Sequence, residues 1–205
     1  MTPEKKKITM VEIPDHERIP IQITRTDRRS LSIRVASDGS ILVRAPRSLS
    51  DKKIKNFVLE KSSWIKAQQS RARRTAAEAA AAGPIGAGAV DALKARAKSV
   101  IPARVAARAA QIGVTYGRIT IRLQKSRWGS CSAAGNLSFN CLLMLCPEEV
   151  WDYVIVHELC HRKEMNHSKR FWDLVGRFCP QYRQAEDWLK KNGSALMLRV
   201  EPLHS

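Results

Sequence analysis

The chain has 205 residues, 44% of them hydrophobic and 27% charged, so it is long enough to bury a core and fits one domain or two small ones. It holds no run of about 18 uncharged apolar residues and no apolar stretch behind the basic N-terminus, so we expect neither a membrane span nor a signal peptide, and a cytoplasmic location. Five cysteines without CxxC spacing argue against a disulfide framework and a thiolate zinc ribbon, and a net charge of +17 favours contact with polyanions.

The first part of the chain, residues 1–74, is predicted to be a β-meander followed by a basic helix. Between residues 19 and 45, apolar residues alternate with polar or basic ones, as in an antiparallel sheet with one buried face, and Asp38-Gly39 is a tight-turn pair. Ser50 or Asp51 can cap the helix that follows. The apolar face of this helix contains Ile54, Phe57, Val58, Trp64 and Ile65.

Residues 75–90 combine alanine with three glycines and a proline, a composition that predicts a linker or hinge. Residues 91–205 form the second predicted domain. A helix over 91–112, kinked or divided at Pro102, leads into strands at 118–123 and 136–140 and then into helices at 147–164, 168–178 and 182–191. The fold class is therefore α+β, with a helical C-terminal unit that contains a small sheet.

The segment HELCHRKEMNH, residues 157–167, contains three histidines and a glutamate at spacings typical of a metal site. His157 and His161 are four residues apart, so they project from one helix face and can share one ion. Glu158 would lie beside a water molecule that the metal has made more acidic, where a carboxylate can take the proton. This pattern predicts a zinc hydrolase.

His167 is the predicted third ligand, because a catalytic zinc usually takes three protein ligands and leaves one position for water. In a continuous helix its side chain would point about 240° away from His161, so the chain must turn. Asn166 tolerates the backbone that ends helices, and Ser168 can cap the next one. Alternative third ligands are Asp173, Glu186 and Asp187; a structural zinc and ordinary surface or core histidines are further alternatives.

Four segments together resemble the YgjP-like metallopeptidase family, which is related to the WLM and SprT-like zincins. They are SRWGSC (126–131), NLSFN (136–140), DYVIVHELCH (152–161) and NHSKRFW (166–172). The resemblance covers roughly residues 15–190. It implies a zincin-like C-terminal unit in which His157, His161 and His167 bind zinc and Glu158 is the general base. The histidine spacing also equals that of metzincins, but Glu164 stands where their turn has glycine, and glutamate resists the positive φ required there.

Arg127 is the candidate for stabilising negative charge on the attacked oxygen, with an ion-pair role in the fold as the alternative. Gly129 permits close backbone approach, and Trp128 either lines a pocket or fills the core. By analogy with zincins, the strand at 136–140 would offer its edge to an extended peptide. Tyr153 either supports the metal site or packs in the core, and we expect Phe171 and Trp172 to pack against the turn that carries His167.

The sequence thus predicts a zinc-dependent metallopeptidase acting on peptides or proteins, without a membrane partner. Two other hypotheses stay open. The basic charge also suits a nucleotide substrate and thus a metal-dependent nucleotide phosphohydrolase. The third hypothesis is a nucleic-acid-associated module with a structural zinc, or a protease recruited to DNA.

Overall fold

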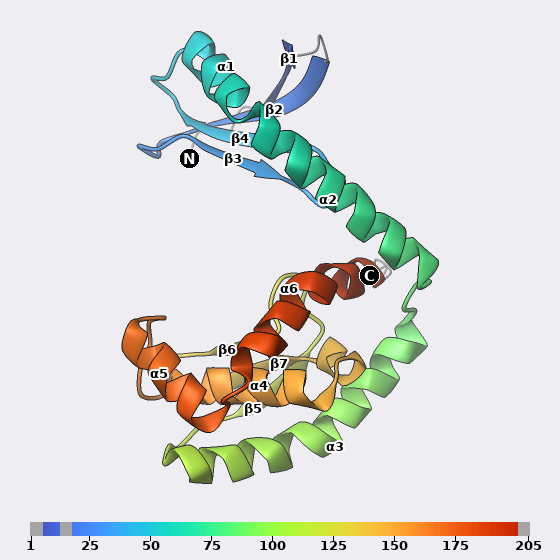
Figure 1. The fold of residues 1–205 in the computed structure, drawn as a ribbon, viewed down its shortest axis with the longest axis vertical. Coiled ribbons are helices and arrows are strands. Elements are labelled where there is room, and N and C mark those ends of the chain that lie inside the picture. The colour runs from blue at the N-terminus through green and yellow to red at the C-terminus, as the bar shows by residue number, and fades with distance from the viewer. Residues whose placement is uncertain (1–5, 13–17, 201–205) are drawn as a thin grey trace. The chain divides into compact units, whose positions relative to one another are not determined.

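The computed structural model describes residues 6–12 and 18–200, and the chain divides into two compact units, Met1–Ala81 and Ala82–Ser205 (Figure 1). Both units combine helices with a small sheet, which confirms the α+β class. Each unit has its own cluster of buried apolar side chains. Within the described residues, no helix has the length and apolar character needed to cross a membrane.

The first unit contains a four-stranded sheet of β1 (Lys6–Glu12), β2 (Arg18–Thr26), β3 (Ser32–Val35) and β4 (Ile41–Pro46), in the order β1-β2-β4-β3. The Asp38-Gly39 turn joins β3 to β4 as predicted, with Gly39 at φ 83°. However, β4 pairs with β2 in parallel, so the prediction of a purely antiparallel meander is wrong. Alternation fixes which face of a strand is buried but not which strand lies beside it.

Two helices follow the sheet: α1 (Asp51–Glu60), whose first turn is capped by Ser50, and α2 (Ser62–Ala81). The sequence predicted one helix here, but it is interrupted at Lys61. Ile54, Val58 and Ile65 are buried on the core of the unit, whereas Trp64, predicted on the same face, is 42% exposed. The interruption at Lys61 separates the apolar positions before it from those after it, so a single helical face does not describe both helices.

The predicted linker at residues 75–90 is mostly helical. Helix α2 extends to Ala81, and α3 (Ala87–Ile112) begins six residues later, so only 82–86 lie outside both helices. Alanine has the highest helix propensity, which explains why this stretch continues α2. Pro102 lies inside α3 without ending it, and Gly113 ends that helix in the left-handed conformation.

The second unit contains a three-stranded sheet of β5 (Ile119–Arg122), β6 (Gly129–Cys131) and β7 (Leu137–Asn140), in the order β5-β7-β6. β6 was predicted only as a loop. A short 3-10 helix, η1 (Cys141–Leu145), leads into α4 (Glu148–Cys160), α5 (Lys169–Phe178) and α6 (Tyr182–Leu198). The three C-terminal helices confirm the predicted series, and α4 is buried along most of its length.

Candidate metal centre

Helix α4 carries the first two histidines, and its position is fixed by packing and by a buried carboxylate. Asp152 is 6% exposed and accepts hydrogen bonds from Arg104 and Arg108 of α3. Because the Asp152 carboxylate is buried and both arginines come from α3, these ion pairs hold α4 against α3. At the other end of α4, His157 and His161 lie one turn apart with ring centroids separated by 5.0 Å.

The chain turns directly after His161, as the predicted geometry requires. Helix α4 ends at Cys160, and α5 begins with Ser168 as its N-cap, whose hydroxyl accepts from the Phe171 N–H. The turn between them returns His167 to the other two histidines. Its Nε2 lies 3.1 Å from Nε2 of His157, although His167 itself is exposed to solvent.

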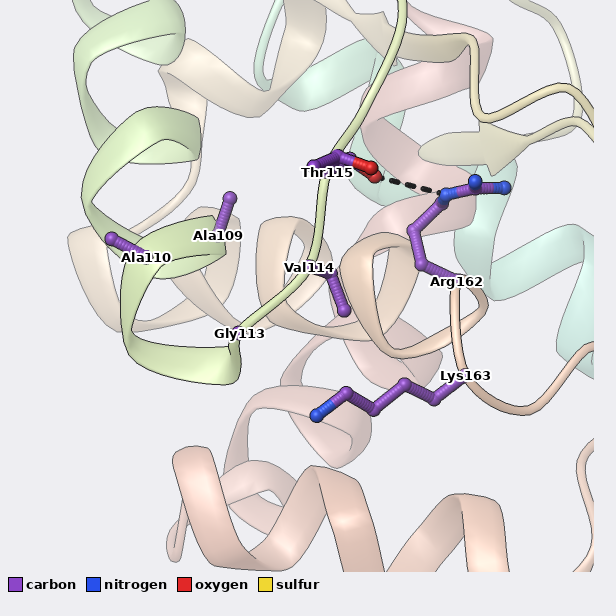
Figure 2. Close-up of a pocket in the computed structure, with 7 residues that line it drawn as sticks. All are labelled: Ala109, Ala110, Gly113, Val114, Thr115, Arg162 and Lys163. Atoms are coloured by element: carbon purple, nitrogen blue, oxygen red, sulfur yellow. Dashed lines mark hydrogen bonds between the residues drawn. The ribbon is translucent and has the colours of Figure 1, made fainter.

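Two side chains that follow His161 anchor this turn to the rest of the unit (Figure 2). Arg162 donates from Nε to the Thr115 carbonyl at 3.0 Å and from Nη1 to the Ala133 carbonyl at 3.1 Å. Lys163 donates from Nζ to the Ile112 carbonyl at 2.6 Å, at the C-terminal end of α3. These bonds tie the turn that carries His167 to α3 and to the loop between β6 and β7.

An aromatic layer supports the three imidazole rings. Phe171 is fully buried, and its ring centroid lies 4.9, 4.5 and 4.8 Å from those of His157, His161 and His167. Trp172 contacts the rings of His157 and His167 at centroid distances of 5.8 Å. Both residues therefore pack against the histidines, as the sequence predicted.

Hydrogen bonds to the ring nitrogens orient the histidines. His161 Nδ1 lies 3.1 Å from the Glu164 carbonyl, an acceptor, so this nitrogen carries the proton and leaves Nε2 free to bind a metal. Tyr153 is buried in the core and also places its hydroxyl 3.4 Å from His157 Nδ1. Tyr153 thus combines the two roles that the sequence left as alternatives.

The donor set fits a zinc ion. One ligand nitrogen from each histidine lies within 4.8 Å of the others. Two nitrogens about 2.0–2.1 Å from a tetrahedral zinc are about 3.3–3.4 Å apart, close to the separation of His157 and His167. Burial, together with the other two histidines, lowers the pKa of His157 to about 3, so its ring is neutral and can coordinate a metal at neutral pH.

The alternative third ligands belong to other interactions. Asp173 pairs with Lys169 on α5, and Glu186 and Asp187 lie within 4 Å of Lys190 on α6. The group of potential metal ligands found among the described residues consists of the three histidines. The geometry therefore favours His167 over the acidic residues.

Glu158 lies on the same helix as the first two histidines and faces the backbone of β6. It is 6% exposed, and burial raises its pKa to about 8, against the opposing effects of the Arg127 charge and a hydrogen bond from the Cys131 backbone. A Cβ added at Gly129 would lie 2.7 Å from Glu158 Oε1. The close backbone approach predicted for Gly129 thus exists, and its neighbour is the Glu158 carboxyl group.

Arg127 and Trp128 come from the loop that precedes β6. Arg127 is exposed, and its charge lowers the pKa of Glu158, so it lies on the Glu158 side of the unit. Trp128 is half-buried against the core, and a Cβ added at Gly193 of α6 would lie 3.0 Å from its ring. Trp128 therefore packs between the β6 loop and α6.

Sequence reasoning placed the free strand edge wrongly. β7, expected to offer its edge, is the central strand, paired with β5 on one side and β6 on the other. The free edge nearest Glu158 belongs to β6. The pair Gly129 and Ser130 has little strand propensity, and this explains why no periodicity marked the strand.

Comparisons with known proteins give the family. No curated protein matches the chain. Two solved structures are similar to part of it. The metallopeptidase zymogen abylysin of Pyrococcus abyssi is 23% identical, with 45% of this chain and 94% of that chain covered and a TM-score of 0.42. The metallopeptidase zymogen jannalysin of Methanocaldococcus jannaschii is 25% identical, with 44% of this chain and 91% of that chain covered and a TM-score of 0.38. The model of the YgjP-like metallopeptidase domain matches residues 29–87 and 85–192. The chain therefore belongs to the YgjP-like metallopeptidase family, and it is a metal-dependent peptidase that acts on peptides or proteins.

Proposed function

We propose that the chain hydrolyses peptide bonds with a zinc ion held by His157, His161 and His167 and with Glu158 as the general base. The observation that carries this proposal is the convergence of three imidazole nitrogens within 4.8 Å of one another. The buried carboxyl group of Glu158 directly follows His157 on α4. Three neutral nitrogen ligands leave the fourth position of a tetrahedral zinc open, which is typical of catalytic rather than structural sites.

The zinc ion would supply a Lewis acid that polarises a carbonyl group and makes a water molecule more acidic. The chain supplies the proton transfers. The ionised form of Glu158, whose pKa is raised to about 8 by burial, takes a proton from the attacking water as the water oxygen bonds to the carbonyl carbon. The protonated carboxyl group then gives a proton to the amide nitrogen as the C–N bond breaks. Its burial excludes bulk water from this exchange.

Arg127 is assigned to the negative charge that develops on the attacked oxygen. Its charge lowers the pKa of Glu158, and this electrostatic effect on the proposed base supports the assignment. Its exposure leaves the guanidinium free to reorient when substrate binds.

The substrate is proposed to bind as an extended strand along β6. Gly129 and Cys131 lie beside Glu158, and β6 is an edge strand with one side unpaired in the sheet. Backbone hydrogen bonds along such an edge bind peptides with little regard to sequence. The predicted nucleic-acid or nucleotide partner rests on the basic charge of the chain and is not part of this proposal.

The test is Glu158→Gln, which keeps the shape of the side chain and removes its basicity. We expect one zinc per chain in both proteins, and cleavage of an unfolded protein that falls about 100- to 10,000-fold in the variant. Cleavage that survives the substitution would reject Glu158 as the base. Hydrolysis of a nucleoside triphosphate that depends on Glu158, in a protein that cuts no peptide, would favour the phosphohydrolase instead.

A further inference from the structure

The edge of the second unit's sheet that is formed by β5 borders a basic groove, on the opposite side of β7 from β6. This groove has a volume of about 600 Å³ and is lined by Lys98 and Pro102 of α3 and by residues 118–122 around β5. β5 and β6 lie on opposite sides of β7, so the groove is separate from the edge assigned above to the scissile peptide.

On the side of β5 away from β7, the backbone has hydrogen-bonding groups with no backbone partner among the described residues. The Leu137 N–H donates to the Arg118 carbonyl, and β5 pairs with β7 in parallel. In a parallel ladder alternate residues bond the neighbouring strand, so Arg118, Thr120 and Arg122 face β7 with their backbone groups. The N–H and C=O groups of Ile119 and Ile121 consequently point to the free edge.

The side chains of the groove divide into an apolar and a cationic set. Ile119 and Ile121 are half-buried and pack against the core, and Arg118 and Arg122 project from the other face of the strand into solvent. Lys98 adds a third exposed cation from α3. Within the described part of the chain, we found no acidic side chain paired with these three cations, and none lines the groove.

We propose that this groove binds an acidic, extended segment of the protein substrate, which adds to β5 as a further strand. Residues 118–122 span about 13 Å, enough for four or five residues of an added strand. Because every second residue of that strand would lie beside Arg118 and Arg122, the favoured segment alternates acidic with apolar residues. The assignment to substrate rests on the peptidase function proposed above.

Two other occupants fit the groove less well. A second copy of the chain pairing through β5 would bring its own Arg118 and Arg122 against the same cations, and like charges on paired strands are destabilising. A nucleic acid would satisfy the cations, but its phosphates cannot pair with the backbone groups of Ile119 and Ile121 as a strand does.

Binding can be measured without cleavage in the full-length Glu158→Gln protein. The probe is a fluorescent peptide of alternating Asp and Val residues, and its matched control has the same sequence with N-methylated backbone at alternate positions. We expect fluorescence anisotropy to show binding of the first peptide and little binding of the second, because methylation keeps the charge and removes the strand hydrogen bonds. Equal binding of both peptides, or stronger binding of a single-stranded oligonucleotide of equal charge, would overturn the proposal.

A charge-reversed variant tests the location. Lys98→Glu with Arg122→Glu should weaken binding about tenfold or more, whereas Lys52→Glu with Lys55→Glu, exposed cations of the first unit, should leave it unchanged. Cleavage can be compared in proteins that keep Glu158. Fusing the acidic segment to a cleavable peptide should lower the KM of the protein with an intact groove, with kcat unchanged, but should not lower the KM of the Lys98→Glu, Arg122→Glu variant. A peptide without the acidic segment should be cut equally by the protein with an intact groove and by the Lys98→Glu, Arg122→Glu variant. If no protein with Glu158 intact cuts either peptide, the proposed function fails, while the binding result is judged separately.

Discussion

His167 differs from the other two histidines because it is exposed and comes from the turn before α5 rather than from α4. The position of its ring depends on the Ser168 cap and on contact with Phe171. These contacts come from residues close to His167 in the sequence, and they hold its ring within reach of His157. His167 is therefore the proposed ligand whose removal should disturb the fold least and report most directly on the metal.

We predict that His167→Ala lowers zinc affinity by more than about 100-fold, because loss of a partner that only supports a ligand already costs 10- to 100-fold. Zinc content after dialysis against a chelator measures the effect, and circular dichroism checks that the fold persists. Glu186→Gln on α6 is the matched control and should retain zinc. Retention of zinc by His167→Ala together with its loss from Glu186→Gln would make the acidic residue the third ligand.

Gly129 helps to position Glu158, because the space beside the Gly129 Cα is occupied by the carboxyl group of Glu158. In Gly129→Ala the new methyl group would lie 2.7 Å from Oε1 and 2.8 Å from Cγ of Glu158, so the carboxyl group must move. We expect zinc content to stay at one per chain and kcat to fall about 100-fold, the size of effect that a displacement of about 1 Å can cause.

The control for this substitution is Gly176→Ala in α5, where a Cβ would make ordinary contact with Tyr182 at 3.5 Å. Alanine is favoured over glycine inside a helix, so this variant should keep full activity. An unchanged kcat in Gly129→Ala would show that the position of Glu158 against β6 does not matter for the reaction.

At the scale of elements, the turn between α4 and α5 joins three parts of the second unit. Arg162 bonds the chain after α3 and the loop between β6 and β7, while Lys163 bonds the end of α3 itself. A Cβ added at Gly135, which has φ 80°, would lie 2.8 Å from the Arg162 guanidinium, so the loop fits closely around this side chain. The turn is thus held by side chains that bind no metal themselves.

We predict that Arg162→Ala weakens zinc binding by about 10- to 100-fold, as expected for a residue that holds a ligand-bearing element in place. Arg162→Lys should be intermediate, since an ammonium group cannot reproduce the planar fork that reaches two carbonyl groups. Competition with a chromogenic chelator measures the affinity, with Arg170→Ala, an exposed cation of α5, as the control. A lower melting temperature with unchanged zinc affinity would limit Arg162 to a role in the fold.

The sequence predicted the elements with strong periodicity or caps and missed those defined by their partners. Helices α4 and α5, the Ser168 cap and the gathering of the three histidines follow from local spacing, so they were predictable. The strand β6 depends on pairing with β7, and the position of β4 between β2 and β3 depends on contacts across the sheet. Trp64 was misplaced for a related reason, because the break at Lys61 depends on how α1 and α2 each pack.

At the scale of the whole molecule, all candidate catalytic and metal-binding residues belong to the second unit. Among the described residues, the buried apolar cluster around α3, α4 and the small sheet is formed by residues of the second unit, and a separate cluster is formed by residues of the first. Yet the family model matches residues of both units, 29–87 as well as 85–192. The candidate site thus uses residues of the second unit alone, while the family model matches residues of both units.

We therefore predict that a fragment of residues 82–205 folds, binds one zinc and cleaves a short unstructured peptide, whereas residues 1–81 bind none. The fragment must begin at 82, because the Gly83 carbonyl accepts from Arg199 and Ile85 pairs with Val200. Zinc analysis, circular dichroism and peptide cleavage of the fragment beside the full chain measure this. A fragment that folds and binds zinc but cleaves no peptide that the full chain cleaves would place part of the substrate site in the first unit. An unfolded fragment would instead show that the core of the second unit is not enough to fold residues 82–205, so that the first unit stabilises the second.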